Sequence, residues 1–341
     1  MTNRADTLHV SLIVTVLNEA SAIGDLLDSI SAQTRAPDEV VIADGGSHDG
    51  TPELVRAWGA GKPFPVQVLS VPGANISQGR NAAIQAAHGE WIACTDAGVR
   101  LDPAWLARLL EPLQAANHTA RTTEVVSGFF VPDPRSTFEL AMGATVLPAV
   151  TDVDPARFLP SSRSIAFAKS AWQAAGGYPE WLDYCEDIVF DLALRRQGAF
   201  AFAPRALVYF RPRGSLRSFF RQYYRYARGD GKADLWRRRQ AIRYAIYLAA
   251  VPLLIALAVL VSPLFWLLLA TGGLAYSRGP YRRLLPALGR LSLPQKLYAL
   301  GLVPVIRVTG DIAKMIGYPV GAVWRLRNPP QQPSPDKLMG R

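Results

Sequence analysis

The sequence predicts an α/β fold in which a doubly wound, mostly parallel sheet fills the first part of the chain. Four short apolar runs have the length and composition of buried strands, at residues 10–17, 40–43, 66–71 and 91–95. A helix is expected after each of these strands, from helical spacing of apolar residues or from a helix-start signal. The expected helices lie at residues 23–30, from residue 51 onward, at residues 77–87 and at residues 103–113. This alternation of strands and helices is typical of a parallel sheet that is covered on both faces.

The pattern changes after a fifth apolar run at residues 125–131. Prolines divide the stretch from there to Pro160, which predicts a loop-rich region. A further helix is expected at residues 188–196 and a late strand at residues 206–210. The α/β domain is therefore expected to occupy residues 1–235.

An uncharged apolar run extends from Tyr244 to Tyr276. It is longer than the ~20 residues that one membrane span needs and short for two full spans. Pro263 divides the run, and arginines flank it on both sides, which favours a hairpin with both ends on the cytoplasmic side. The alternative is a buried helical hairpin of a soluble protein.

The C-terminal part of the chain continues this membrane-associated pattern. Residues 297–326 mix apolar with charged residues, and we expect a helix that lies in the membrane interface. Membrane-associated helices are thus predicted over residues 236–327. Residues 328–341 are rich in proline and polar groups and are expected to be disordered.

Composition narrows the choice of partners and compartment. The net charge of +10 can favour nucleic acid, anionic lipid or an anionic substrate. Aromatic RNA-binding motifs and zinc-ligand spacings are absent, so no nucleic-acid partner is expected. The two cysteines provide no disulfide framework, which fits a reducing cytosolic setting.

Two of the predicted strands end in a carboxylate. Asp44 follows the strand that contains residues 40–43, and Asp96 follows the strand at residues 91–95. Because ligands of open α/β sheets bind at the carboxyl ends of the strands, both acids should face one crevice. Glycines directly after Asp44 allow the backbone to turn sharply and to approach a ligand. One acid can hold a base or ribose hydroxyl, and the other a metal or sugar phosphate.

Six motifs together resemble one known family. Those of the nucleotide-sugar half are Val14–Glu19, Asp44–Ser47 with Asp49–Thr51, Gly79–Asn81 and Thr95–Gly98, and those of the acceptor half are Glu186–Asp187 and Gln222–Tyr226. In this order they are similar to the motifs of family 2 glycosyltransferases, over about the first two-thirds of the chain. The resemblance implies a GT-A-type fold and a membrane-associated bacterial enzyme at the cytoplasmic inner membrane, with its catalytic domain in the cytosol.

The resemblance also implies roles in donor binding. Asp44 would accept hydrogen bonds from the nucleobase, Arg80 would lie near the base or phosphates, and Asn18 with Glu19 would line the pocket. Each has a local alternative: a turn aspartate, a solvated arginine and a pair that caps a helix. Asp96 is what remains of the family's Asp-x-Asp motif, whose third position is Gly98 here. The motif implies Mg²⁺ or Mn²⁺ bound through Asp96 and the donor phosphates.

The acceptor-side motifs imply the chemistry. Asp187 would deprotonate the acceptor and Glu186 would orient it, although acids at a helix start also interact favourably with the helix dipole. Gln222, Arg225 and Tyr226 resemble the family's Gln-x-x-Arg-Trp motif and would contact the diphosphate or acceptor. Their alternative is a basic, aromatic helix at the membrane interface.

The resulting expectation is an inverting glycosyltransferase. It would move a sugar from a nucleotide diphosphate sugar to a lipid-linked acceptor or an envelope polysaccharide, in contact with membrane lipid. Two other classes remain open: a nucleotidyltransferase, which would release pyrophosphate, and a non-catalytic protein that binds nucleotide sugars in an envelope assembly complex.

Overall fold

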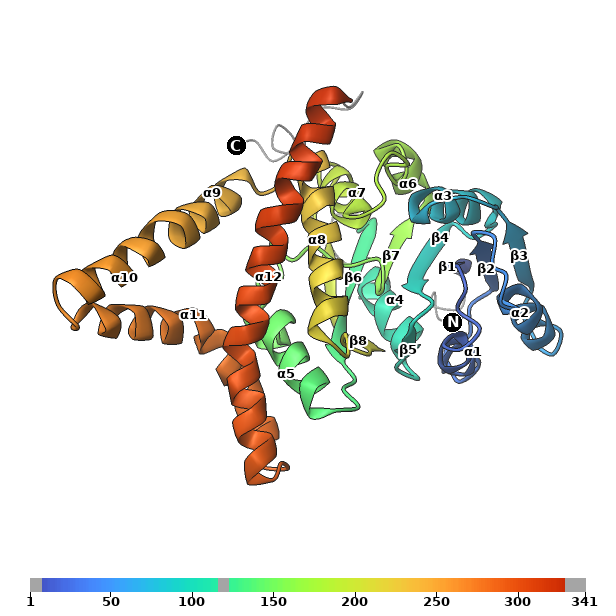
Figure 1. Cartoon of the computed structure of the whole chain (residues 1–341). Coiled ribbons are helices and arrows are strands. Elements are labelled where there is room, and N and C mark those ends of the chain that lie inside the picture. The colour runs from blue at the N-terminus through green and yellow to red at the C-terminus, as the bar shows by residue number, and fades with distance from the viewer. Residues whose placement is uncertain (1–7, 116–122, 329–341) are drawn as a thin grey trace. The chain divides into compact units, whose positions relative to one another are not determined.

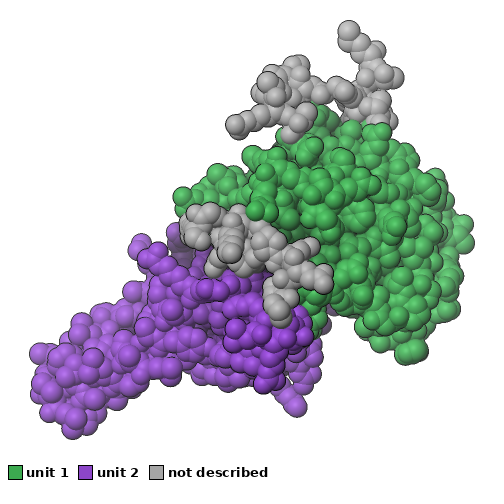
Figure 2. Space-filling model, turned by 90° about the horizontal axis from the view of Figure 1, so that it is seen from above, with its two compact units in different colours: residues 1–131, 150–210 green, residues 132–149, 211–341 purple. Residues whose placement is uncertain are grey.

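A computed structural model describes residues 8–115 and 123–328 of the chain. The expected disordered tail lies outside the described residues from residue 329 onward. The chain divides into two compact units, shown in Figure 2: residues 1–131 with 150–210, and residues 132–149 with 211–341.

The first unit is built on an eight-stranded sheet with the order β3-β2-β1-β4-β7-β6-β8-β5 (Figure 1). The strands are β1 (Val10–Val16), β2 (Glu39–Asp44), β3 (Val66–Ser70), β4 (Trp91–Asp96), β5 (Val99–Leu101), β6 (Val125–Pro132), β7 (Ile165–Ala168) and β8 (Ala201–Phe210). The four strands β3-β2-β1-β4 are mutually parallel, as expected. Beyond them the sheet is mixed, because β7 runs antiparallel to both β4 and β6, and β5 runs antiparallel to β8.

Helices cover both faces of this sheet. They are α1 (Ile23–Ser31), α2 (Thr51–Gly59), α3 (Ile76–Ala86), α4 (Trp105–Ala115), α6 (Lys169–Ala175) and α7 (Glu186–Arg195), and a short 3-10 turn covers Val150–Asp152. Alternate residues of a strand point to opposite faces. Thus Leu12 packs in the core with α1 and α4, whereas its neighbour Ile13 packs with α3, α6 and α7. The doubly wound architecture predicted from the sequence is therefore present.

The second unit is helical. It contains α5 (Thr137–Val146), α8 (Leu216–Lys232), α9 (Arg237–Ala245), a π-helical turn at Ile246–Ala250, α10 (Val251–Leu260), α11 (Phe265–Leu288) and α12 (Leu293–Arg327). Glycines allow α12 to approach α8 closely: a Cβ on Gly317 or Gly321 would meet the carbonyl oxygens of Tyr224 and Arg228. Phe219, Val303 and Ile306 lie in the buried core that α8 and α12 share with α5.

Helices α10 and α11 form the hairpin expected from the apolar run (Figure 1). The helices break at residues 261–264, around Pro263. Within the described part of the chain one helical stretch, Arg237–Leu260, is long and apolar enough to cross a membrane. Its side chains are largely uncovered, and Leu253 and Leu260 are 59% and 80% exposed.

Candidate active site

The loops after β1 and β2 are joined at the carboxyl edge of the sheet. The side chain of Asn18 accepts a hydrogen bond from the amide of His48 at 2.9 Å, and its own amide donates to Ser47 Oγ at 2.8 Å. Glu19 donates its amide to Thr51 Oγ1 at 2.9 Å. Asn18 holds a left-handed backbone conformation with φ of 55°. The predicted donor-pocket residues therefore belong to one loop pair beside Asp44.

Asp44 organises the turn that follows β2. Its buried carboxylate accepts hydrogen bonds from Ser47 Oγ at 2.6 Å and from the amide of Gly46 at 3.2 Å. Gly46 needs its lack of a side chain, because its φ is 100°. The local role of Asp44 as a turn aspartate is thus realised, while nucleobase binding stays a prediction. Both roles are compatible because a carboxylate has about four lone-pair directions.

Arg80 lies at the centre of the site and is not a solvated arginine. Only 3% of its side chain is exposed. One guanidinium nitrogen donates to Glu186 Oε1 at 2.7 Å and another to Asp96 Oδ1 at 2.9 Å. The guanidinium carbon also lies 5.2 Å from the ring centre of Tyr178. Arg80 therefore connects the carboxylate at the end of β4 with the carboxylate that begins α7.

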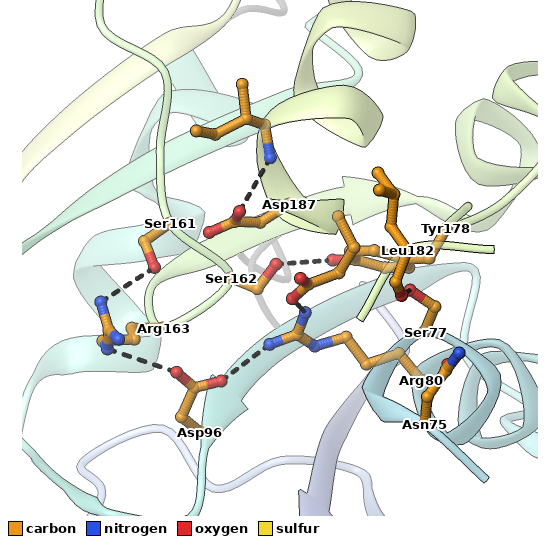
Figure 3. A network of polar contacts seen from close by, with 12 residues as sticks. Asn75, Ser77, Arg80, Asp96, Ser161, Ser162, Arg163, Tyr178, Leu182 and Asp187 are labelled. Carbon is orange, nitrogen blue, oxygen red and sulfur yellow. Dashed lines mark hydrogen bonds and ion pairs between the residues drawn. The ribbon is translucent and has the colours of Figure 1, made fainter. Parts of the chain in front are cut away.

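Asp96 is held from its other side by Arg163 (Figure 3). Arg163 Nε lies 3.3 Å from Asp96 Oδ2, and Arg163 also donates to Ser161 Oγ at 3.3 Å. Arg163 falls where family 2 glycosyltransferases have their acceptor loop, but no sequence motif predicts its contact with Asp96. The missed signal is the strand register: Cys94 pairs with Ile165 in the antiparallel β4–β7 ladder, which brings the chain just before β7 to the end of β4.

Glu186 and Asp187 form the first turn of α7, two residues earlier than the expected helix start. Burial and the neighbouring Asp187 raise the pKa of Glu186 to about 7, although Arg80 opposes the shift. Burial also raises the pKa of Asp187, against the influence of Arg80 and Arg163. A carboxylate whose pKa approaches the working pH accepts a proton more effectively than an ordinary one. The pair is therefore suited to acid–base chemistry.

Asp191 lies one helical turn after Asp187 and is 1% exposed. Within the described residues its Oδ2 atom has no hydrogen-bond partner. Burial, and then the charge of Asp187, raise the pKa of Asp191 well above its ordinary value, which favours the neutral acid. Asp191 is thus a buried acid and not a solvent-exposed one near the helix start.

Asn81, the residue after Arg80, makes a second group of contacts beside the site. Asn81 Oδ1 accepts from the amide of Tyr178 at 2.9 Å and from Trp172 Nε1 at 3.1 Å. The Tyr178 hydroxyl lies 3.0 Å from Ser162 Oγ. Gly177 has a φ of 75°, and a Cβ there would lie 3.0 Å from Asn81 Oδ1. Asn81 thus anchors the Tyr178 ring beside Arg80, a positioning role that the motif Gly79–Asn81 did not reveal.

The remaining predicted site residues lie on α8, in the second unit. Gln222 donates from Nε2 to the Tyr226 hydroxyl at 2.8 Å and accepts from Arg213 Nε at 3.3 Å. Arg225 is exposed on the same helix. The one-face spacing of Gln222, Arg225 and Tyr226 is present, and their roles at the diphosphate or acceptor stay predictions.

The metal-ligating atoms available around Asp96 determine how a divalent cation could bind there. Gly98 provides no second carboxylate, and within the described residues no group of three or more His, Cys, Asp and Glu side chains could hold a metal ion. Asp96 retains lone pairs beyond its two ion pairs, and 25% of its side chain is exposed. The residues present fit a cation that binds through one carboxylate and takes its other ligands from substrate phosphates and water.

Comparison with a solved structure identifies the fold. The solved structure of the mannosyltransferase PcManGT from Pyrobaculum calidifontis, in complex with GDP-Man and Mn²⁺, aligns over 90% of this chain and 87% of that chain with a TM-score of 0.58 and 22% identity. It shows that this chain has the GT-A fold.

The sequence relatives include proteins named for succinoglycan biosynthesis. Succinoglycan biosynthesis protein ExoA of Rhizobium meliloti (strain 1021) is 28% identical over 273 residues, which are 75% of this chain and 79% of that protein. ExoO of the same organism is 38% identical over 109 residues, so this chain spans only 30% of that protein. The undecaprenyl-phosphate 4-deoxy-4-formamido-L-arabinose transferase of Aeromonas hydrophila subsp. hydrophila is 33% identical over 118 residues, 35% of its length.

A family model described as glycosyl transferase family 2 matches residues 11–166, which contain the donor-side motifs. Together with the relatives and the fold, this match identifies residues 11–166 as a family 2 glycosyltransferase domain, in agreement with the sequence-based prediction.

Proposed function

We propose that this protein is an inverting glycosyltransferase that uses a nucleotide diphosphate sugar. The observation that carries the proposal is the constellation of Asp96, Arg80, Glu186 and Asp187 at the carboxyl edge of the sheet. It combines a charged group for phosphates with a buried carboxyl pair for proton transfer, at the edge where open α/β sheets bind ligands.

Asp187 is the general base of the proposed reaction. It accepts the proton of the acceptor hydroxyl while the oxygen forms a bond to the anomeric carbon of the donor sugar. The bond from that carbon to the diphosphate oxygen breaks, and its electron pair leaves with the nucleoside diphosphate. One displacement with one base inverts the anomeric centre, so a product that keeps the donor's configuration would contradict this role.

Glu186 and Arg80 organise the base. Glu186 accepts from Arg80 at 2.7 Å, and this ion pair fixes the first turn of α7, from which Asp187 projects. The negative charges of the two acids raise each other's affinity for protons. In the proposed enzyme Glu186 orients the acceptor and sets the pKa at which Asp187 becomes active.

We further propose that Asp96 holds Mg²⁺ or Mn²⁺ together with the donor diphosphate. When bound, the cation neutralises charge on the departing diphosphate. Asp44, Asn18 and Glu19 form the loop pair that grips the nucleoside.

The second unit supports membrane attachment. Figure 1 shows α12 running across the base of the hairpin formed by α10 and α11. The side chains along one face of α12 are apolar and 42–50% exposed: Val305, Val308, Ile312, Ile316, Val320 and Val323. Their spacing of three or four residues makes one stripe on the helix. We infer that the hairpin enters the bilayer from the cytosol and that α12 lies in the interface.

The acceptor class follows from this attachment. An enzyme attached to a membrane shares that surface with lipid-linked substrates, and relatives named for succinoglycan biosynthesis and for undecaprenyl-phosphate sugar transfer support such an acceptor. We therefore propose a lipid-linked or growing glycan acceptor at the cytosolic face of the inner membrane.

A panel of nucleotide sugars tests the reaction class. Detergent-extracted protein is incubated with each donor, with or without native lipid extract, and released nucleoside diphosphate is measured. Release that requires the lipid extract supports the transferase and names the donor. Pyrophosphate formed from a nucleoside triphosphate and a sugar phosphate would instead establish a nucleotidyltransferase, and binding without turnover would establish a non-catalytic binding protein.

A further inference from the structure

Arg163 occupies a defined place opposite Asp96. The antiparallel ladder that pairs Cys94 with Ile165 brings Arg163, two residues before β7, beside the end of β4. Thr95 Oγ1 donates to the carbonyl oxygen of Arg163 at 2.9 Å and fixes its backbone there. The pairing of β4 with β7 therefore positions the Arg163 guanidinium at the carboxyl edge of the sheet.

The two arginines at Asp96 are held very differently. Arg80 is 3% exposed and is bound by two carboxylates, at 2.7 and 2.9 Å. Arg163 is 24% exposed, and its Nε atom lies 3.3 Å from Asp96. This distance is long for a charge-assisted hydrogen bond, which is normally about 2.7–2.9 Å. Arg163 is thus the more exposed of the two cations, and its ion pair with Asp96 is longer than that of Arg80 (Figure 3).

Two aromatic rings limit where the Arg163 guanidinium can move. Its central carbon lies 5.0 Å from the ring centre of Phe210 and 5.9 Å from that of Phe130. An arginine over an aromatic face keeps its N–H edge available for hydrogen bonds in the plane of the group. The rings therefore support a guanidinium that can turn toward a ligand without entering bulk solvent.

Position 98, two residues after Asp96, has free space around it. A Cβ placed on Gly98 would meet no atom within 4 Å, so no packing constraint keeps a side chain from this position. A loop that has one carboxylate in place of two carries less negative charge, and it leaves more of the donor's phosphate charge to be balanced by cationic side chains. A guanidinium matches two phosphate oxygens in a bidentate geometry.

Resting on the proposed function, we propose that Arg163 turns from Asp96 to the donor and binds the sugar-linked phosphate of the diphosphate. Two N–H groups of Arg163 donate to oxygens of that phosphate, and they stay bound when the bond to the sugar breaks and the electron pair leaves with the phosphate. The exchange also frees one oxygen of Asp96 from its ion pair. Arg163 thereby selects diphosphate over monophosphate donors and stabilises the leaving group.

Calorimetric titration of UDP, GDP, UMP and GMP into the full-length protein tests this inference, with and without EDTA. In the wild type the diphosphate of the preferred nucleoside should bind more tightly than its monophosphate. Arg163→Ala should weaken the diphosphate by about tenfold to a hundredfold, the range of a hydrogen bond to a charged group. It should leave the monophosphate almost unchanged, and the difference should persist in EDTA. Arg163→Lys keeps the charge but loses the planar guanidinium, so its affinity for the diphosphate should lie between those of the wild type and Arg163→Ala.

Arg157→Ala is the matched control, because Arg157 lies on the same segment, is 84% exposed and pairs only loosely with Asp154 at 3.6 Å. It removes the same charge and should change neither affinity. An equal loss of monophosphate and diphosphate binding in Arg163→Ala would show a structural role and overturn the inference, as would no loss at all. If none of the four binds, the titration is repeated with the nucleoside diphosphate and monophosphate of every donor in the nucleotide-sugar panel, and a wild type that binds none of these would overturn the proposed function itself, and the inference with it.

Discussion

The guanidinium of Arg80 lies 2.7 Å from the Glu186 carboxylate, and this ion pair is almost completely buried. It joins α3, which follows the donor-side strands, to the first turn of α7, which carries the proposed base. Because the second carboxylate at Arg80 is Asp96, one side chain links the phosphate side of the site with the acid–base side.

Removal of Arg80 should therefore destabilise the fold as well as stop turnover. Arg80→Leu leaves the buried Glu186 without a counter-charge, and the loss of one partner of a buried pair costs about 3–5 kcal/mol. Urea unfolding measures the change. In the control Arg56→Leu the broken pair with Glu53 is exposed, and the expected cost is at most about 1 kcal/mol. Equal stabilities of the two variants would contradict the description of Arg80 as the central tie.

The rate should depend on pH through the carboxyl pair. Asp187 must be ionised to accept a proton, and the pKa of its partner Glu186 is raised to about 7 by burial and by the charge of Asp187. Burial also raises the pKa of Asp187, so kcat/KM should rise with pH through a range above the usual carboxyl pKa and then level off. Glu186→Gln removes a negative charge beside the base, so the acid limb should move to lower pH. An unchanged acid limb in this variant would show that the pair does not titrate together.

Metal removal should inhibit the enzyme. Dialysis against EDTA should abolish nucleoside diphosphate release, and added Mg²⁺ or Mn²⁺ should restore it, because Asp96 and the donor phosphates would together hold the cation. Asp96→Asn should not recover on addition of the metal. Full activity after EDTA treatment would rule out the proposed cation site.

The buried Asp191 side chain should lower the free energy of unfolding. Its pKa is raised in the folded state, so the folded protein retains a proton that the unfolded chain loses above its ordinary pKa. Stability is therefore lost as pH rises toward the folded-state pKa. Asp191→Asn removes this penalty and should raise Tm by more at pH 8 than at pH 5. An equal change of Tm at both pH values would show that Asp191 does not titrate in this way.

The strands and helices of the donor half were predictable because their signals are local. The apolar runs that form β1 to β4 and the helical spacing in α1 depend only on residues close in sequence. The antiparallel strands β5, β7 and β8 were harder, because their pairing joins distant segments such as Val99 and Phe210. The alternation of strand and helix predicts parallel crossovers only.

The site residues were also predictable only where their signals are local in sequence. Asp96, Glu186 and Asp187 could be chosen from motifs, since residue type and strand or helix ends indicate their chemistry. The burial of Arg80, the role of Asn81 and the approach of Arg163 to Asp96 depend on contacts between segments far apart in sequence. Nothing in a local pattern distinguishes Arg163 from the exposed Arg157 on the same segment.

Asp187 removes the acceptor proton in the proposed reaction, and a comparison of two Asp→Asn variants isolates this role. Nucleoside diphosphate release with the preferred donor and lipid extract is measured for the wild type, Asp187→Asn and Asp191→Asn. The last two make the same change one helical turn apart on α7. Asp187→Asn should lower kcat by about 10²–10⁴, while Asp191→Asn should retain near wild-type activity. A wild-type rate in Asp187→Asn, or an equal loss in both variants, would contradict this role of Asp187.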